Sequence, residues 1–465
     1  MIVPEKTYAH FIGVGGAGMS GIALVLNARG IAITGSDLRE SRYSRALVEA
    51  GVPVRIGHDA DHLGDPEVVV VSTAIPERNP ELTEARRRGI EVWPRAKMLA
   101  NLAENRMTVA VAGTHGKTST SSMIATMLSR MELDPTFLIG GEVDGFDTNA
   151  ANGSGRHFVV EADESDGSFV YLTPDVAVVT NIEADHLDHY GSLAEIERTF
   201  AEFMARTPDD GVLVVCGDDA RLVELARESG RAVLTYGFAP SCDVRCAAGR
   251  RLGEGHEFTV ELEDGSVIAC ATSIPGLHMV SNSAAALATA YALQLDLGRA
   301  ATALATFSGV RRRFDHIGSA AGVTVVDDYA HHPTEVRATL KAAAELDFSR
   351  VWAVFQPHRY SRTAAFSADF GDSFEHADRV VLMDVYSAGE APIPGVTGKT
   401  LLDSTLRRRP RTRAAYLPHR ADIVPYLLSV VHSGDLVMTM GAGDVTTLGP
   451  ELLDALNDKI GQVSP

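Results

Sequence analysis

The stretch that most constrains the fold runs from Met107 to Arg130 and reads MTVAVAGTHGKTSTSSMIATMLSR. Its first six residues form an apolar run of strand length, and residues 119–130 carry apolar side chains at helical spacing. The glycine-rich segment 113–118 is therefore the turn between a strand and a helix. Such a turn directs several backbone N–H groups and the positive end of a helix dipole at one point, which favours an anion there. The sequence predicts a phosphate-binding loop.

Two side chains indicate that the bound phosphate belongs to a nucleotide. Lys117 would reach the β- and γ-phosphates, and the Thr118 hydroxyl would ligate Mg²⁺. The pattern departs from the full GxxxxGK[ST] motif, because Val111 occupies the position of the first glycine. The alternative is an ordinary glycine turn with a solvated lysine. The expected nucleotide-binding residues of this loop are Gly113, Thr114, His115, Gly116, Lys117, Thr118 and Ser119.

The overall composition narrows the classes of partner. A chain of 465 residues suggests three domains of about 150 residues each. Its formal net charge of −19 leaves no basic surface of the kind that nucleic acids require, so we expect no nucleic-acid partner. The four cysteines have no metal-binding spacing and are too few for a disulfide framework. No signal peptide or membrane-inserted segment is expected, which favours a cytoplasmic protein.

A second glycine turn lies near the N-terminus. A short strand leads to Gly13, the segment GVGGAGMSG and an apolar helix follow, and the next strand ends at Asp37. The glycines match GxGxxG, so the literal interpretation is an NAD site in which Asp37 binds a ribose hydroxyl. A nucleotide-sugar diphosphate at the helix N-terminus satisfies the same pattern. Ser72 and Thr73 follow a third strand, at an edge where open α/β sheets bind ligands, although a hydroxyl-capped loop is the alternative.

Two further strand ends carry clusters typical of a metal site. HFVVEADESD at residues 157–166 ends an apolar strand in acids, and TNIEADHLDHY at 180–190 ends the next in acids and histidines. Mg²⁺ prefers oxygen ligands, and the strand beside a phosphate loop commonly supplies a carboxylate. Glu161 is the first choice, and His186 would anchor a second metal. The alternatives are a solvated acidic loop after Glu161 and a structural role for His189.

The last third of the chain predicts another α/β unit, whose polar strand ends face a cleft. Paired arginines there suit a carboxylate or phosphate group, which they bind through two parallel hydrogen bonds. A surface ion pair is the alternative for any one arginine. The polar residues at these strand ends are Asp327, Asp328, Tyr329, His331, His332, His358, Arg359 and Arg362.

The junction before this unit contains two candidate nucleotide contacts. His278 and Asn282 stand four residues apart where an alanine-rich helix opens. Nucleotide contact is one interpretation, and capping of the helix by Asn282 is the other. A basic run at residues 309–318, which includes Arg313, marks a boundary before the last unit.

Several of these segments together closely resemble the Mur ligases, over nearly the whole chain. The matching segments are HFIGVGGAGMSGIA, AGTHGKTST, EADESD, TNIEADHLDHY, DDYAHHPTE and FQPHRYSRT. Within the family, GGAGMSG and DDYAHHPTE point to the member that adds L-alanine. The resemblance implies an N-terminal Rossmann-like domain for a UDP-sugar at residues 1–106 and a central P-loop ATPase domain with a mostly parallel sheet at 107–312. A C-terminal Rossmann-like domain at 313–465 would contact ATP and the amino acid.

The resemblance also implies roles for individual residues. Thr118 and Glu161 would hold one Mg²⁺, and Glu161 and His186 would hold a second, with Mn²⁺ as a possible substitute. The implied catalytic residues are Lys117, Glu161, His186, His331 and Arg359. The implied ATP contacts outside the loop are His278, Asn282, Arg313 and Asp328. The implied UDP-sugar contacts are Gly15, Gly16, Ala17, Gly18, Met19, Ser20, Asp37, Ser72 and Thr73. The implied amino-acid contacts are Tyr329, His331, Arg359 and Arg362.

Two departures from family patterns accompany these roles. Met279 replaces the first asparagine of the GxHNxxN motif, a position at which the resemblance implies an adenine contact. The lysine that several relatives carbamylate has no counterpart between Leu187 and Arg206, as expected for the alanine-adding member.

The implied reaction is ATP-dependent ligation of L-alanine to the carboxylate of UDP-N-acetylmuramate through an acyl phosphate, for peptidoglycan precursor synthesis. The nearest alternative is a recycling ligase that adds a preformed murein peptide to the same UDP-sugar. An NAD-dependent oxidoreductase built on the first glycine turn and a module that hydrolyses ATP without ligation are further alternatives. We expect a monomer or a homodimer.

Overall fold

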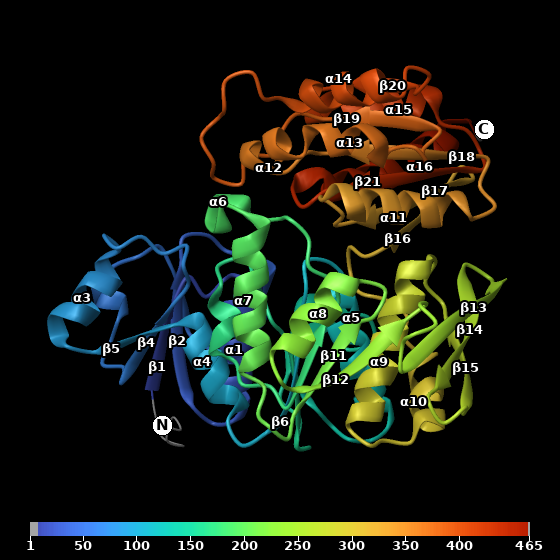
Figure 1. The fold of residues 1–465 in the computed structure, drawn as a ribbon. Helices are drawn as coiled ribbons and strands as arrows, with labels where there is room; N and C mark the ends of the chain where they lie inside the picture. The colour runs from blue at the N-terminus through green and yellow to red at the C-terminus, as the bar shows by residue number, and fades with distance from the viewer. Residues whose placement is uncertain (1–7, 464–465) are drawn as a thin grey trace. The chain divides into compact units, whose positions relative to one another are not determined.

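The computed structural model describes residues 8–463, which fold around three α/β sheets (Figure 1). By its contacts the chain divides into two compact units. Of the described residues, the first unit comprises 8–247, 258–271 and 281–307, and the second comprises 248–257, 272–280 and 308–463. The predicted α/β class with mostly parallel sheets is confirmed. Within residues 8–463, no helix is both long and apolar enough to cross a membrane.

The N-terminal sheet has five parallel strands in the order β3-β2-β1-β4-β5. The strands are β1 (Tyr8–Ile12), β2 (Ala32–Asp37), β3 (Val54–Ile56), β4 (Val68–Val71) and β5 (Glu91–Pro94). The helices are α1 (Ala17–Ala28), α2 (Arg42–Glu49), η1 (Ala60–His62), α3 (Pro80–Arg88) and α4 (Arg95–Ala103).

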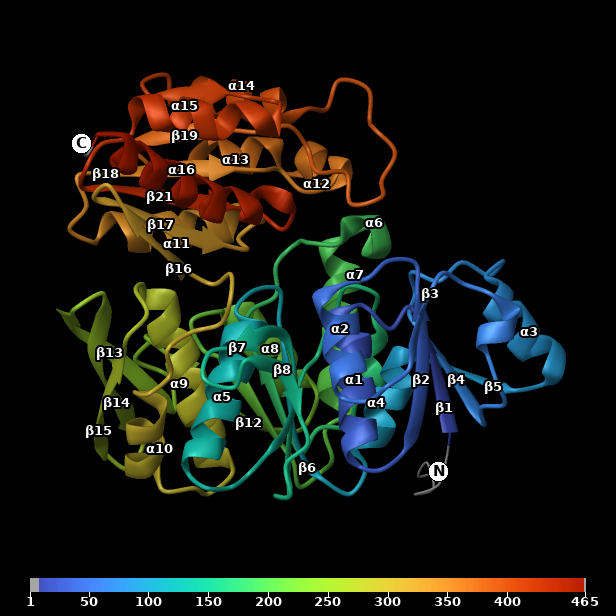
Figure 2. The ribbon, with the colours of Figure 1, turned by 180° about the vertical axis from the view of Figure 1, so that it is seen from behind.

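Successive side chains of β4 pack on opposite faces of this sheet, and helices cover both faces. Val68 and Val70 join the core that includes α1 and α4, whereas Val69 packs in a separate cluster with Leu82 of α3. Successive side chains of a strand point to opposite faces, so an all-apolar strand requires helices on both. Figure 2 shows α1 and α3 on different sides of these strands.

The central sheet has ten strands in the order β15-β14-β13-β12-β11-β10-β6-β9-β7-β8. The strands are β6 (Met107–Ala112), β7 (Thr136–Val143), β8 (Thr148–Ala151), β9 (His157–Glu161), β10 (Val176–Val179), β11 (Val212–Cys216), β12 (Ala232–Gly237), β13 (Val244–Leu252), β14 (Gly255–Leu262) and β15 (Val267–Thr272). The helices are α5 (Lys117–Arg130), η2 (Ser168–Tyr171), α6 (Leu187–Tyr190), α7 (Leu193–Ala205), α8 (Ala220–Glu228), α9 (Leu277–Ala292) and α10 (Leu297–Leu304).

The place of β6 in this sheet positions the site. It lies between β10 and β9 and runs parallel to both. The carboxyl ends of parallel neighbours meet at one sheet edge, so the three segments that follow these strands are brought together. The predicted strand Met107–Ala112 is confirmed in both bounds, and the predicted helix begins at Lys117, two residues earlier than its apolar spacing indicated.

The C-terminal sheet has six strands in the order β16-β17-β21-β18-β19-β20, antiparallel only between β16 and β17. The strands are β16 (Asp315–Ala320), β17 (Val323–Asp328), β18 (Arg350–Phe355), β19 (Arg379–Leu382), β20 (Ala414–Tyr416) and β21 (Asp435–Met440). The helices are α11 (Pro333–Ala344), α12 (Tyr360–Ala365), α13 (Ser367–Ser373), α14 (Gly398–Arg408), η3 (Arg420–Asp422), α15 (Ile423–Val430), η4 (Asp444–Thr447) and α16 (Leu448–Val463).

Both faces of this sheet are packed as well. Trp352 and Val354 of β18 join the core formed with α15 and α16. Phe355, the next residue, instead packs its ring against Phe370 and Phe374, at centroid distances of 5.3 and 5.4 Å. Successive side chains of β18 point to opposite faces of the sheet, so this apolar strand is covered by helices on both faces.

Candidate active site

The loop between β6 and α5 adopts a backbone conformation that requires glycine. Gly113 has a φ of +133°, which is accessible essentially to glycine alone, and a Cβ atom there would lie 2.0 Å from the Thr180 hydroxyl. Gly116 has a φ of +80°, and a Cβ atom there would lie 2.8 Å from the Asn282 side-chain oxygen. The two glycines allow the loop to pack tightly where it turns into the N-terminus of α5.

The segment after β10 braces the loop from one side. The Thr180 hydroxyl donates to the His115 carbonyl at 2.5 Å. The Asn181 side chain accepts from His115 N at 2.9 Å and donates to His115 O at 3.1 Å. These contacts hold the loop at both the amide and the carbonyl of His115, so the chain's own residues order its backbone. Thr180 and Asn181 were not predicted as site residues from the sequence, although their position directly after an apolar strand was the available signal.

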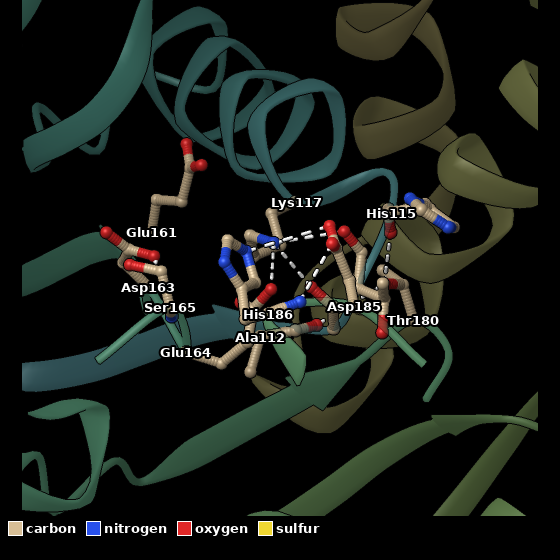
Figure 3. A network of polar contacts seen from close by, with 12 residues as sticks. Ala112, His115, Lys117, Glu161, Asp163, Glu164, Ser165, Thr180, Asp185 and His186 are labelled. Carbon is tan, nitrogen blue, oxygen red and sulfur yellow. Dashed lines mark hydrogen bonds and ion pairs between the residues drawn. The ribbon is translucent and has the colours of Figure 1, made fainter. Parts of the chain in front are cut away.

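Lys117 is folded back over the loop rather than extended into solvent. Its ammonium donates to the carbonyls of Gly113 at 2.6 Å and Thr114 at 3.1 Å. It also donates to Glu164 Oε1 at 2.8 Å, a buried residue in the segment after β9. The alternative of a solvated lysine is wrong, because the side chain is largely buried and ion-paired. Figure 3 shows the Lys117 ammonium beside the Glu164 side chain.

The two predicted ligands of the first metal meet directly. The Thr118 hydroxyl donates to Glu161 Oε1 at 2.9 Å, and Gly140 N donates to Glu161 Oε2 at 2.6 Å. Glu161 ends β9, so the sheet places its carboxylate beside the first turn of α5. A hydroxyl and a carboxylate that converge beside a phosphate loop are the oxygen donors a hard cation prefers. The donor set therefore fits Mg²⁺.

His186 lies at the start of α6, beyond the same sheet edge. It has a φ of +48°, an uncommon left-handed conformation for a side chain larger than glycine. Its amide donates to Asp185 Oδ1 at 2.8 Å, and its Nε2 lies 3.7 Å from Asp185 Oδ2. Figure 3 shows the ring turned toward this carboxylate. The local backbone thus fixes His186 and Asp185 as a pair.

The N-terminal glycine turn forms the start of α1 and is held by its own neighbours. Asp37 accepts from Gly15 N at 2.8 Å, and the Ser41 hydroxyl donates to Gly15 O at 2.8 Å. A Cβ atom at Gly18 would lie 2.4 Å from the Arg95 guanidinium, so a guanidinium covers this glycine. Asp37 was predicted to bind a ribose hydroxyl, and the observed contact of its Oδ2 is with the turn itself.

A buried polar network lies beneath this turn. Glu81 accepts from His10 Nε2 at 2.6 Å and from the Ser36 hydroxyl at 2.8 Å, and it contacts His58 Nδ1 at 2.7 Å. The Ser36 carbonyl in turn accepts from Gly13 N at 2.8 Å. Burial raises the pKa of Glu81, but hydrogen bonds from His10, Ser36 and His58 more than offset this effect and leave the pKa below its ordinary value. The network ties the turn to the sheet.

A cavity of about 220 Å³ connects the glycine turn to the phosphate loop's sheet edge. Ala17 and Gly18 line it from α1, Arg95 from α4, and Glu161 and Asp163 from the end of β9. Arg95 pairs with Asp163 across it at 3.3 Å. One cavity therefore contains both a helix N-terminus suited to a diphosphate and a carboxylate suited to a metal.

The remaining predicted contacts of the glycine turn differ in accessibility. Gly16 is exposed, whereas the side chains of Met19 and Ser20 are buried and can offer only backbone to a ligand. Ser72 lies beside the turn, 3.7 Å from where a Cβ atom of Gly13 would stand. Thr73 is exposed and donates to Asp166 at 3.4 Å.

Asn282 lies against the phosphate loop, as its contact with Gly116 shows. The alternative that Asn282 caps α9 is wrong, because this helix begins at Leu277 and Asn282 falls within its second turn. His278 lies in the first turn of the same helix and is exposed.

In the second unit, Asp328 is a buried carboxylate at the end of β17. It accepts from Phe314 N at 2.8 Å and Ala330 N at 2.7 Å. Burial raises the pKa of Asp328 to about 6, although the positive charge of Arg313 offsets part of this effect. Arg313 lies over the Tyr329 ring at 5.2 Å and pairs with Glu335 at 3.7 Å. The carboxyl of Asp328 thus links the residue that precedes β16 to the turn that follows β17.

Two of the four predicted amino-acid contacts, His331 and Arg362, lie against His358, and a third, Tyr329, lies against His331. The ring of His331 lies 5.3 Å from that of Tyr329 and 5.9 Å from that of His358. Arg362 Nη1 lies 3.3 Å from His358 Nδ1. Burial, together with the charges of Arg362 and Arg359, lowers the pKa of His358 to about 4. At neutral pH the imidazole is therefore neutral and can accept the hydrogen bond of Arg362.

Arg359, the fourth predicted contact, is held by a residue that the sequence analysis missed. Its Nε lies 2.7 Å from Glu390 Oε1, and its φ is +69°. Glu390 also accepts from the amide of Ser361 at 3.0 Å and from its hydroxyl at 2.5 Å. Glu390 and Tyr386, which stacks on His358 at 5.7 Å, belong to the irregular segment between β19 and α14. No motif or periodicity marks that segment.

Three family models match the chain in order. The Mur ligase family catalytic domain matches residues 8–107, the Mur ligase middle domain matches 111–290, and the Mur ligase glutamate ligase domain matches 312–443.

Full-length relatives decide the family. A UDP-N-acetylmuramate–L-alanine ligase from Pelotomaculum thermopropionicum is 45% identical over 460 residues, which cover 98% of this chain and 100% of that protein. The chain belongs to the Mur ligase family. A second relative of this Mur ligase, the UDP-N-acetylmuramate–L-alanine ligase of Kineococcus radiotolerans, is 48% identical over 458 residues and covers 97% of this chain and 96% of that one.

Two solved structures are similar to the structure of this Mur ligase over nearly its whole length. A UDP-N-acetylmuramate–alanine ligase from Thermotoga maritima matches with a TM-score of 0.81 and 28% identity, covering 98% of this chain and all of that one. A murein peptide ligase from Psychrobacter arcticus matches with a TM-score of 0.73 and 27% identity, covering 97% and 99%.

Proposed function

We propose that this Mur ligase joins L-alanine to the carboxylate of UDP-N-acetylmuramate with ATP, giving UDP-N-acetylmuramoyl-L-alanine, ADP and phosphate. The observation that carries the proposal is the cavity shared by the glycine turn at Gly18 and the carboxylate of Glu161. A nucleotide-sugar diphosphate at the N-terminus of α1 can share this cavity with the phosphoryl-transfer groups. The substrates named for the full-length relatives from P. thermopropionicum and K. radiotolerans support the same assignment.

The phosphate loop would bind the ATP phosphates. Backbone N–H groups at the N-terminus of α5 stabilise anionic oxygens, and Lys117 adds a full positive charge. Phosphoryl transfer depends mainly on positioning and charge stabilisation, which an already ordered loop supplies. The muramyl carboxylate attacks the γ-phosphorus and ADP leaves. The resulting acyl phosphate carries a phosphate group that an amine can displace from the acyl carbon.

Thr118 and Glu161 would hold Mg²⁺, as their converging oxygens indicate. When bound, the ion neutralises charge on the phosphate oxygens. A second ion held by Glu161 and His186, and replacement of Mg²⁺ by Mn²⁺, are parts of the proposal. Glu161 itself orders the edge of β7 through Gly140 N.

The second unit would bind the amino acid. Arg362 and Arg359 offer guanidinium groups for the alanine carboxylate, with Tyr329 and His331 beside them. The free amine of alanine attacks the acyl carbon, and the tetrahedral intermediate collapses with loss of phosphate. We place the functional domain divisions after residue 106 and after residue 312.

The test is the fate of a labelled oxygen. If the muramyl carboxylate carries ¹⁸O, one labelled oxygen is expected in the released phosphate for each ligation. Phosphate without label would refute the acyl phosphate.

The recycling-ligase alternative predicts a different acceptor. ATP consumption is measured with UDP-N-acetylmuramate and either L-alanine or a murein tripeptide, and turnover with L-alanine is expected. Turnover with the tripeptide alone would favour the alternative.

A further inference from the structure

Every hydrogen-bond donor of the Lys117 ammonium is already in use. The group has three N–H donors, and it makes three hydrogen bonds, to Gly113 O, Thr114 O and Glu164 Oε1. A phosphate oxygen can receive a hydrogen bond from Lys117 only if one of these bonds breaks. The bond to Glu164 is the one made to a separate segment of the chain, whereas the other two lie within the loop.

Glu164 is placed by its backbone as well as by its side chain. Its carbonyl accepts from Gly167 N at 2.9 Å and from the Tyr190 hydroxyl. Only 3% of Glu164 is exposed, so the carboxyl has almost no contact with solvent. These contacts within the chain itself fix the position of Glu164.

The carboxyl of Glu164 is only half satisfied. Its Oε2 is buried and has no hydrogen-bond partner within residues 8–463. Burial raises the pKa of Glu164 to about 7, although Lys117 offsets part of this effect. A buried carboxylate with one unpaired oxygen depends strongly on its remaining partner.

We propose that Glu164 is a positioning residue that holds the Lys117 ammonium against the phosphate loop and releases it when a nucleotide phosphate binds. The inference rests on the proposed function only in that the loop binds an adenine nucleotide. Glu164 and the phosphate compete for one cation, so the apparent affinity for nucleotide is lowered by the fraction of molecules in which Lys117 is engaged.

This competition predicts whether a substitution at Glu164 strengthens or weakens the binding of ADP. Glu164→Gln keeps the shape of the side chain and removes its negative charge, so Lys117 is released more easily. ADP should bind more tightly to this variant, by about fivefold if the engaged state dominates. A residue that bound the nucleotide or its metal directly would give the opposite sign.

The experiment is calorimetric titration of ADP into the full chain and its variants. Glu195→Gln is the matched control, because it removes one negative charge from an exposed position on α7 in the same unit. The control should bind ADP as the wild type does. Glu164→Ala, which removes the acceptor altogether, should tighten binding at least as much as Glu164→Gln, and thermal unfolding confirms that each variant is folded.

A double variant tests whether the change in ADP affinity depends on Lys117. In a Lys117→Ala background, Glu164→Gln should change ADP affinity by less than about twofold, since the competed contact is gone. Unchanged or weaker binding by Glu164→Gln, or a full effect without Lys117, would overturn this inference while leaving the proposed function intact. Failure of the wild type to bind ADP would overturn both.

Discussion

The hydroxyl of Thr118 donates a hydrogen bond of 2.9 Å to the carboxylate of Glu161, 43 positions away in the sequence. The contact arises because β6 and β9 are parallel neighbours and end at the same sheet edge. The hydroxyl oxygen of Thr118 keeps its lone pairs for a cation while its proton is donated to Glu161, so the two residues form a site whose geometry is set by the sheet.

Glu161→Gln tests this site directly. The amide retains an acceptor for Thr118 but loses the negative charge that a divalent cation requires, so the Mg²⁺ concentration for half-maximal ligation should rise by at least about tenfold. Ligation is measured across an Mg²⁺ titration at saturating ATP. An unchanged midpoint would show that Glu161 is not a ligand.

His186→Ala probes the second proposed metal. Loss of the imidazole should lower the ligation rate and raise the Mg²⁺ requirement, while the hydrogen bond between Thr118 and Glu161 stays intact. The same titration serves, with Mn²⁺ as a second ion. If neither titration curve moves, the assignment of His186 to a metal is wrong.

Lys117→Ala should remove most ligation, by about 10²- to 10³-fold, because the variant loses the full charge that faces the transferring phosphoryl group. Phosphate release with both substrates measures the effect. Lys97→Ala is the matched control, since Lys97 is an exposed lysine of the same unit that pairs with Glu91 at 3.2 Å. Near-normal turnover by the Lys117 variant would contradict the role.

Glu390→Gln should raise the KM for L-alanine by about tenfold and leave the KM for ATP unchanged, because Arg359 loses the ion pair that orients it. Glu451→Gln, which removes an exposed partner of Arg420 in the same unit, is the control. Steady-state kinetics with each substrate varied in turn separates the two constants. Equal changes in both would indicate a general loss of structure.

Glu81→Gln should destabilise the first unit by about 3 kcal/mol at pH 7, because a buried charge partner of two histidines is removed. The pKa of Glu81 lies below its ordinary value of 4.5, so the carboxylate contributes stability above pH 4.5 that is lost as the pH falls through the folded-state pKa. Urea unfolding of both proteins should show the difference shrinking below pH 4.5. A constant difference would show that ionisation of Glu81 is not involved.

The sequence predicted those features that local chemistry determines. The strand Met107–Ala112, the glycine turn after it and the carboxylate at Glu161 each follow from a short pattern of residues. No local pattern of residues predicts the order of the strands in the sheet. That order places β10 beside β6, and so brings Thr180 and Asn181 into contact with the phosphate loop. Residues that follow a neighbouring strand contact the loop only through the parallel pairing of the sheet.

Glu164 and Glu390 show a second limit of local patterns. Glu164 stood in the acidic run after β9, for which a solvated loop was the alternative, and the fold instead buries it against Lys117. Glu390 lies in an irregular segment, so only the folded chain reveals its pairing with Arg359. Acidic residues carry no periodicity that distinguishes a buried partner from an exposed one.

The bracing of the phosphate loop by Thr180 and Asn181 has a thermodynamic consequence. The loss of backbone freedom in residues 113–116 occurs when the chain folds, and not when a nucleotide binds. Nucleotide binding should therefore proceed without the unfavourable entropy that disorder-to-order transitions impose, and inorganic pyrophosphate alone should already find a formed receptor.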